Sequence, residues 1–153
     1  MQVSKKDQKR KNESGCDIFR VIVTGLAFLG MAKILIVDDS PSYRLQLSQL
    51  VQRLGHSVEV AADGEEGVQK AQADHPDLVL MDVVMPGMNG FEAKRTLARD
   101  EATAHIPVVF VTTQNDNVDR DWGMRQGAVD YMTKPVDAAS LQAAIDAAIA
   151  NRR

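Results

Sequence analysis

Residues 78–90 decide the fold of this 153-residue chain, and they read Leu78-Val-Leu-Met81, then Asp82, then Val83-Val-Met-Pro-Gly-Met-Asn-Gly90. A continuous apolar run of this length is typical of a strand that is buried on both faces of a parallel sheet. The Pro and Gly residues after it indicate a loop, which leads into a predicted helix from Phe91 to about Arg99. Asp82 is therefore expected alone at the carboxyl end of a central, buried strand.

Three other apolar runs also end in residues that carry chemistry. They are Ile34-Leu-Ile-Val37 before Asp38-Asp39, Val108-Val-Phe-Val111 before Thr112-Thr113, and the weaker Val129-Asp-Tyr-Met132 before Lys134-Pro135. Ligands of open α/β sheets bind at the carboxyl ends of parallel strands. We therefore expect three carboxylates, a hydroxyl and an ammonium to converge at one edge of one sheet.

Helices are predicted between the strands, and a short second strand is predicted at Ser57–Ala61. The first helix is expected to begin with a Ser40 cap and Pro41 at its first position and to end at Gly55, with an apolar stripe of Leu45, Leu47, Leu50, Val51 and Leu54. Further helices are expected at Glu65–Ala73, in a segment that ends at Gly127, and from an Asp137 cap to about Ala150. This alternation predicts an α/β fold, a doubly wound, five-stranded parallel sheet in the order 2-1-3-4-5 with five helices. No further domain is expected after the last helix.

The composition is that of a globular protein, with 44% hydrophobic and 25% charged residues. Residues 31–153 carry twelve Lys/Arg and eighteen Asp/Glu. An acidic domain without a basic stripe is a poor candidate for binding nucleic acid, which needs clustered cations against phosphate. The single cysteine, Cys16, cannot form an internal disulfide, so a reducing, cytoplasmic compartment is expected.

The first thirty residues do not fit the pattern of the rest. A basic run at Lys5–Lys11 precedes the mostly apolar stretch Ile18–Gly30, which is too short to span a membrane and is interrupted by Arg20. No Ala-x-Ala cleavage site of a signal peptide follows. We interpret residues 1–30 as an N-terminal extension that is disordered or precedes the true initiator Met31, with membrane tethering as the alternative. Residues 31–153 form the predicted domain, without membrane insertion.

Three clustered carboxylates indicate a divalent cation, because their mutual repulsion is costly without one. Mg²⁺ is the expected ion, since it accepts a few carboxylates and keeps waters and phosphate oxygens in its octahedral shell. Asp38, Asp39 and Asp82 are its expected ligands, and Asp82 is also suited to attack phosphorus and form an acyl phosphate. Lys134 would neutralise charge on the transferred group, and the Thr112 hydroxyl would contact one of its oxygens.

The chain from residue 31 to 150 resembles the receiver domain of bacterial two-component response regulators, which has a flavodoxin/CheY-like fold. The resemblance rests on Ile-Val-Asp38-Asp39-Ser, Leu-Met-Asp82 with the loop to Gly90, Val-Thr112-Thr and Lys134-Pro135, in that order. It implies Mg²⁺-dependent phosphorylation of Asp82 by the phosphohistidine of a sensor kinase and a cis Lys134–Pro135 bond. It also implies a metal contact from the backbone carbonyl of Val84, and a switch in which Thr112 and Tyr131 move together.

Among receivers, the run Trp122–Val136 is most similar to the stand-alone, chemotaxis-type regulators of twitching motility in type IV pilus systems, the PilH-like group. This similarity implies a CheA-like histidine kinase as phosphodonor. It also implies an output protein that recognises the face formed by the fourth helix, fifth strand and fifth helix. The protein itself is expected to be a monomer or a weak dimer. The alternatives are a phosphate sink or relay without an output partner and, less favoured, a phosphohydrolase. A phosphohydrolase needs a second acid near the nucleophile, whereas Val83-Val84 follow Asp82.

Other conspicuous side chains are assigned to packing or to the surface. Met85, Met88 and Phe91 are expected to pack rather than to take part in chemistry. Trp122 is either part of the core or an exposed binding anchor. The three histidines lack the spacing of metal ligands and are expected at the surface: His56, His75 and His105.

Overall fold

A five-stranded parallel sheet forms the centre of the protein, for which a computed structural model describes residues 31–114 and 116–150. The strands are β1 (Lys33–Val37), β2 (Ser57–Ala61), β3 (Leu78–Met81), β4 (Val108–Thr112) and β5 (Asp130–Thr133). They lie in the order β2-β1-β3-β4-β5, which confirms the predicted order. Val37 is opposite Met81 in the β1–β3 pair. Asp38 and Asp82 follow these two residues in the chain, so the two aspartates lie side by side at the carboxyl edge of the sheet.

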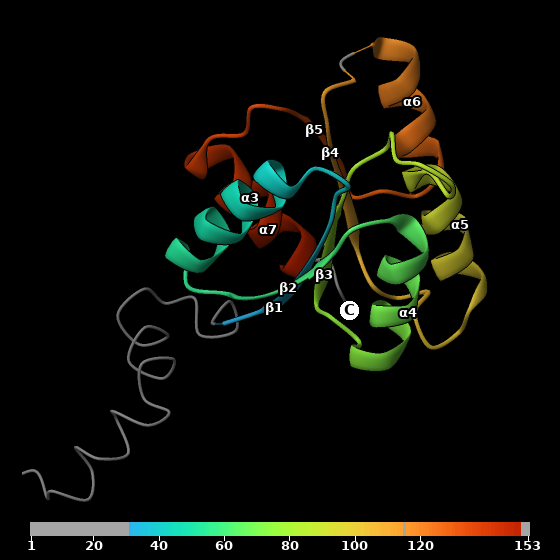
Figure 1. Cartoon of the computed structure of the whole chain (residues 1–153), viewed down its shortest axis with the longest axis horizontal. Helices are drawn as coiled ribbons and strands as arrows, with labels where there is room; N and C mark the ends of the chain where they lie inside the picture. Colours follow the sequence, from blue (N-terminus) through green and yellow to red (C-terminus); the bar gives the residue numbers. More distant parts are fainter. Residues whose placement is uncertain (1–30, 115, 151–153) are drawn as a thin grey trace, which may run out of the picture. The chain divides into compact units, whose positions relative to one another are not determined.

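Five helices follow the strands and cover both faces of the sheet (Figure 1). They are α3 (Pro41–Arg53), α4 (Gly64–Asp74), α5 (Gly90–Arg99), α6 (Asn117–Arg125) and α7 (Ala138–Ala150). In Figure 1, α3 and α7 lie on one side of the sheet, and α4, α5 and α6 lie on the other. Coverage of both faces explains why the central strands are continuously apolar rather than alternating.

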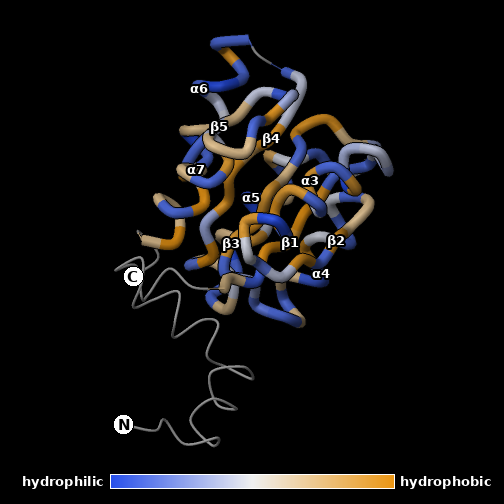
Figure 2. The backbone as a smooth tube through the Cα atoms, turned by 90° about the vertical axis from the view of Figure 1, so that its left-hand side faces the viewer, coloured by the Kyte–Doolittle hydropathy of each residue, from blue (hydrophilic) through white to orange (hydrophobic). Residues whose placement is uncertain are grey.

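The strands supply nearly half of the buried apolar side chains, and their apolar segments lie near the centre of Figure 2. Leu35 and Phe110 belong to the hydrophobic cluster that α4 and α5 join through Val68 and Leu97. Ile34 is also fully buried, and it points to the opposite face because side chains alternate along a strand. The register of the sheet is therefore fixed by packing on both sides.

Capping residues start each helix close to the carboxyl edge of the sheet. The Ser40 hydroxyl accepts a hydrogen bond from the Tyr43 N–H, and Pro41 is the first residue of α3, as predicted. Asp63 caps α4 and Asn89 caps α5, and each side chain accepts a hydrogen bond from the N–H of the third residue of its helix. The Asp137 carboxylate accepts a bond from the Ser140 N–H at 2.7 Å. The first turns of these helices therefore flank the edge at which the strands end.

Several predictions for single residues were wrong. Leu45 is exposed, whereas Leu47 and Val51 are buried, because side chains two positions apart do not share a helix face. His56 is buried rather than at the surface, and its Nδ1 accepts a hydrogen bond from the Ala32 N–H at 3.1 Å. Helix α6 ends at Arg125 rather than running to Gly127.

Met85 and Phe91 are buried, which confirms that they pack in the interior. Trp122 is partly exposed at the surface rather than enclosed in the core. The proposed N-terminal extension, residues 1–30, lies outside the described residues. Within the described ranges, no helix combines the length and the apolar character that crossing a membrane requires.

Candidate functional site

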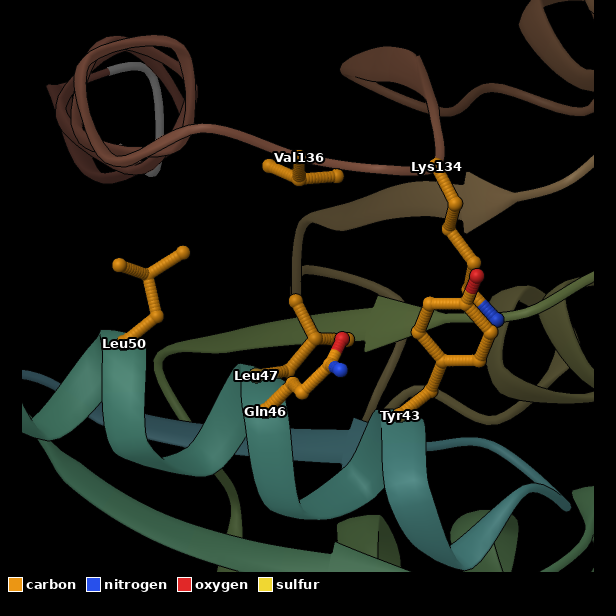
Figure 3. Close-up of a pocket in the computed structure, with 6 residues that line it drawn as sticks. All are labelled: Tyr43, Gln46, Leu47, Leu50, Lys134 and Val136. Carbon is orange, nitrogen blue, oxygen red and sulfur yellow. The ribbon is translucent and has the colours of Figure 1, made fainter.

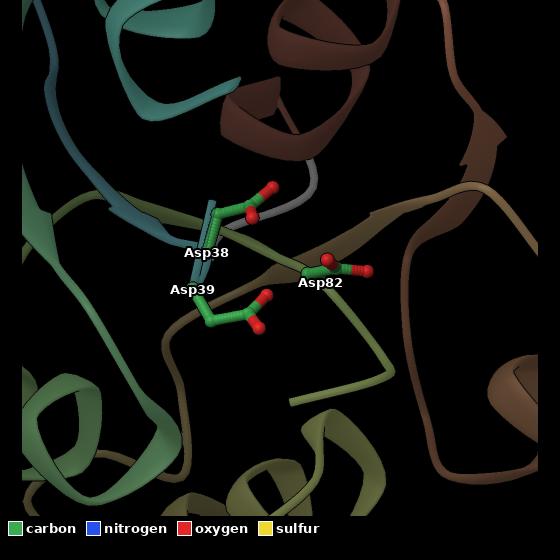
Figure 4. A group of neighbouring side chains, drawn as sticks. All are labelled: Asp38, Asp39 and Asp82. Carbon is green, nitrogen blue, oxygen red and sulfur yellow. The ribbon is translucent and has the colours of Figure 1, made fainter. Parts of the chain in front are cut away.

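Three carboxylates meet at the carboxyl ends of β1 and β3 (Figure 4). One oxygen from each of Asp38, Asp39 and Asp82 lies within 4.8 Å of the others. Asp38 is 1% exposed and Asp82 is 7% exposed, while Asp39 is open to solvent. The cluster thus combines two carboxylates in the protein interior with one that an ion can reach from solvent.

Lys134 reaches this cluster from the residues that follow β5. Its Nζ lies 2.6 Å from Oδ2 of Asp38 and 3.3 Å from Oδ2 of Asp82, and its side chain is only 3% exposed. The Lys134–Pro135 peptide bond is cis, as the family resemblance predicts. One ammonium does not balance three carboxylates, so the site retains a negative charge that suits a divalent cation.

Backbone groups hold the other oxygens of the two buried carboxylates. The Val83 N–H donates to Oδ1 of Asp82 at 2.7 Å, and the Ser40 N–H donates to Oδ1 of Asp38 at 2.9 Å. In each buried carboxylate, Oδ1 therefore accepts a backbone hydrogen bond and Oδ2 forms an ion pair with Lys134. Such a cluster is oriented before any ligand arrives, which is the condition for electrostatic catalysis.

The pKa of Asp82 is raised above its ordinary value. Burial is the main cause, and the charge of Asp38 adds to it, while Lys134 and Thr112 act in the opposite direction. The negative charge on Asp82 is thus poorly solvated in the metal-free protein. A cation that binds beside it would relieve this cost.

Glycine residues let the loop after β3 pass close to its surroundings. A Cβ on Gly90 would overlap the carbonyl oxygen of Asp82, and a Cβ on Gly64 would lie 2.7 Å from the carbonyl oxygen of Met88. The Gly90 N–H also donates to the Val83 carbonyl at 2.8 Å. These approaches hold the loop that follows Asp82 close to the Asp82 backbone and to the start of α4.

Thr112 and Tyr131 share one neighbour, Gln114. Thr112 ends β4 and is fully buried, and its Oγ1 accepts a hydrogen bond from the Gln114 N–H at 3.3 Å. The Tyr131 side chain is also buried, and its hydroxyl donates to the Gln114 carbonyl at 2.8 Å. Helix α6 approaches the Tyr131 ring closely, because a Cβ on Gly123 would lie 2.9 Å from it.

The structure brings together four of the predicted site residues, namely Asp38, Asp39, Asp82 and Lys134. It places the fifth, Thr112, at the same sheet edge. For Val84 the structure gives an exposed side chain, and the role of its carbonyl stays a prediction.

Sequence reasoning missed Tyr43 and Arg44 in the first turn of α3. The Tyr43 ring faces the Lys134 ammonium, and Nη1 of Arg44 donates to the Asp38 carbonyl at 2.7 Å. Their position directly after the Ser40 cap could have indicated a place in the site, because a helix that starts just past Asp39 must place its first turn beside the carboxylates.

The sequence pattern of the response regulator receiver domain matches residues 34–146, so the chain belongs to this family. Receiver domains are phosphoacceptors that take a phosphoryl group from histidine kinases, and they bind Mg²⁺ at an acidic pocket. The chain is thus a receiver domain of two-component signalling.

Among its relatives, Protein PilH of Pseudomonas aeruginosa is 51% identical over 120 residues, which cover 78% of this chain and 99% of PilH. The regulatory protein AfsQ1 of Streptomyces coelicolor is 37% identical over 119 residues, but the chain spans only 52% of its length. The matched 120 residues therefore cover almost the whole of PilH, whereas the longer regulator AfsQ1 is matched over about half of its length.

Solved structures agree with this assignment. The chemotaxis protein CheY4 of Vibrio cholerae has a TM-score of 0.71 and 35% identity, covering 76% of this chain and 98% of CheY4. The receiver domain of a sensor histidine kinase from Pseudomonas aeruginosa, with magnesium in its active-site cleft, has a TM-score of 0.74 and 29% identity, covering 80% and 100% of the two chains.

Proposed function

We propose that this protein is a single-domain response regulator in which phosphorylation of Asp82 switches the affinity for an output protein. The proposal rests mainly on the position of Asp82. It is a buried carboxylate at the end of the central strand, 3.3 Å from the Lys134 ammonium and beside two further carboxylates. It acts as a phosphoacceptor and not as a turnover enzyme.

Asp82 acts as the nucleophile in this reaction. One carboxylate oxygen forms a bond to the phosphorus of a phosphohistidine, the P–N bond breaks, and the departing imidazole nitrogen keeps the electron pair and takes up a proton from water. Lys134 counters the charge on the oxygens of the transferred group, and the Thr112 hydroxyl donates to one of them. Removing a preorganised donor of this kind typically lowers a rate by about 10²- to 10³-fold.

Asp38, Asp39 and Asp82 would hold Mg²⁺, with the backbone carbonyl of Val84 as a further ligand. An all-oxygen donor set with an unbalanced negative charge supports a hard cation. Once bound, the ion supplies positive charge to the carboxylates and to the phosphoryl oxygens. Asp38, which already pairs with Lys134 at 2.6 Å, would then interact with both cations.

The switch runs through Gln114. If the Thr112 hydroxyl turns to a phosphoryl oxygen, it gives up the bond from the Gln114 N–H. The Gln114 carbonyl is the acceptor for Tyr131, so movement of this loop releases the Tyr131 hydroxyl. A coupling of about 1–3 kcal/mol is sufficient to change partner affinity about 5- to 150-fold.

The output face is formed by α6, β5 and α7. Exposed apolar side chains on α6 support a protein partner there, since Val118 is 72% exposed and Trp122 is 46% exposed. Such residues favour an output partner over a phosphate sink. The similarity to PilH supports a cytoplasmic pathway of pilus-driven motility with a CheA-like kinase.

The proposal is tested by incubating the protein with Mg²⁺ and acetyl phosphate and measuring its intact mass. We expect a gain of one phosphoryl group that EDTA prevents and that Asp82→Asn abolishes. Asp146→Asn on α7 is the matched control and should be phosphorylated like the wild type. Phosphorylation of Asp82→Asn, or none in folded wild-type protein, would contradict the assignment.

The output partner is tested separately. Protein held in the phosphorylated state is compared with unphosphorylated protein for capture of proteins from the pilus machinery, with Trp122→Ala as a second bait. State-dependent binding that Trp122→Ala loses supports the output face. Equal capture by both states would favour a phosphate sink.

A further inference from the structure

A tyrosine outside the acidic cluster faces the lysine of the site. The centroid of the Tyr43 ring lies 3.9 Å from Nζ of Lys134. In Figure 3, the ring stands on the first turn of α3 beside the end of the Lys134 side chain. The pocket drawn there lies between α3 and the segment after β5 and is also lined by Gln46, Leu47, Leu50 and Val136.

The contact has the geometry of a cation–π interaction. An ammonium within about 6 Å of a ring centroid is attracted by the negative face of the ring, and the attraction is stronger where water is excluded. The Lys134 side chain is 3% exposed, so the interaction is largely desolvated. Three groups therefore surround Nζ, namely the carboxylates of Asp38 and Asp82 and the Tyr43 ring.

The backbone that carries Tyr43 is tied to the site. The Tyr43 N–H donates to the Ser40 hydroxyl at 3.4 Å, and the neighbouring Arg44 donates to the Asp38 carbonyl at 2.7 Å. Ser40 in turn donates to the Asp38 carboxylate. The ring is thus held against Lys134 by the same turn that orients Asp38.

We propose that Tyr43 is a positioning residue for phosphoryl transfer, because its ring keeps the Lys134 ammonium beside Asp82. The inference rests on the proposed function of Asp82 as phosphoacceptor. The shorter of the two ion pairs of Lys134 is with Asp38, which is also an expected metal ligand. With Asp38 engaged by a metal, the ring would remain as a partner that attracts the ammonium without competing for the ion.

An aromatic ring suits this task better than another carboxylate. A further negative charge would add to the repulsion among the three clustered carboxylates. Without the ring, the strongly hydrated lysine ammonium can withdraw to solvent on its flexible stem. The fraction of molecules with Lys134 in place would then fall, and the rate would fall with it.

The first test measures phosphorylation by acetyl phosphate at saturating Mg²⁺. We expect Tyr43→Leu to lower the rate about 2- to 30-fold, the range that cation–π interactions span. Tyr43→Phe keeps the ring and should stay within about 2-fold of the wild type. Gln46→Ala alters the same pocket without touching Lys134 and should also match the wild type.

A second test asks whether Tyr43 acts through Lys134. In a Lys134→Met background, Tyr43→Leu should cause no further loss of rate. A further loss as large as in the wild-type background would overturn the proposal, because the ring would then act by another route. If Tyr43→Leu does not fold, the comparison of Tyr43→Phe with Tyr43→Met replaces it.

A spectroscopic readout separates this inference from the proposed function. The ring current of Tyr43 should shift the ε-methylene protons of Lys134 upfield in wild type and Tyr43→Phe, and Tyr43→Leu should lose the shift. If wild-type protein is not phosphorylated, the function of Asp82 fails while the shift still reports the contact. If wild type is phosphorylated and Tyr43→Leu reacts at the same rate, the positioning role alone is refuted.

Discussion

Two lysine side chains are buried among the residues that the structure describes, and their surroundings differ. Lys134 lies between the carboxylates of Asp38 and Asp82. Lys94, in α5, is 7% exposed, and the described part of the chain offers it no ion pair. Burial lowers the pKa of Lys94, because the charged form is poorly solvated there.

Comparing the two lysines shows which kind of buried ammonium indicates a reactive site. A buried ammonium that contacts opposite charges is part of an oriented electrostatic site. A buried ammonium without such partners mainly reduces stability. The two lysines should therefore respond in opposite ways when each is replaced by methionine, which has a similar length and no charge.

The largest difference is expected in phosphorylation. Lys134→Met should slow phosphorylation of Asp82 by about 100-fold or more, because the ammonium stabilises the charge of the transferred group. Lys94→Met should react at the wild-type rate. Both rates are measured by following the intact mass over time with acetyl phosphate and Mg²⁺. If the two variants lost phosphorylation rate to a similar extent, the proposed difference between the two lysines would be wrong.

The second difference concerns stability without metal. Lys134→Met should lower the free energy of unfolding by about 3 kcal/mol in EDTA, because it leaves two buried carboxylates without their cation. Mg²⁺ should stabilise this variant by binding the folded state. Urea unfolding with and without Mg²⁺ measures the effect, and a variant as stable as wild type in EDTA would contradict it.

Replacing Asp82 in the same site should change the free energy of unfolding by a smaller amount. Asp82→Asn should stabilise the metal-free protein by about 1 kcal/mol at pH 7, since a buried charge is replaced by a neutral group of similar shape. The folded-state pKa of Asp82 is raised, so its ionisation weakens the folded state as pH rises from the unfolded value of about 3.9 through the folded one. Urea unfolding should show the advantage shrinking as the pH is lowered toward that value.

The smallest effect is expected at Lys94. Lys94→Met should raise the free energy of unfolding by about 0.5 kcal/mol at pH 7. The folded-state pKa of Lys94 is lowered, so wild type gains stability as pH rises from that pKa toward about 10.4, and the advantage of methionine disappears there. Arg95→Met on the same helix is the control and should change stability by less than about 0.5 kcal/mol.

Much of the fold could be predicted because its signals are local. The apolar run at 78–81, the Ser40 cap with Pro41, and the Asp137 cap each act within a few residues. The burial of single side chains was less predictable. Leu45 and His56 were misplaced, because burial depends on which elements pack together and not on residue type alone.

Local sequence patterns were enough to place acidic, hydroxyl and basic groups after parallel strands, and parallel strands bring their carboxyl ends to one edge. Which atoms meet at that edge depends on the three-dimensional packing. Lys134 and Asp38 are 96 positions apart in the chain and 2.6 Å apart in space. The Tyr43 ring reaches Lys134 because α3 packs beside the segment after β5. Such contacts depend on the packing of distant elements, which no local pattern encodes.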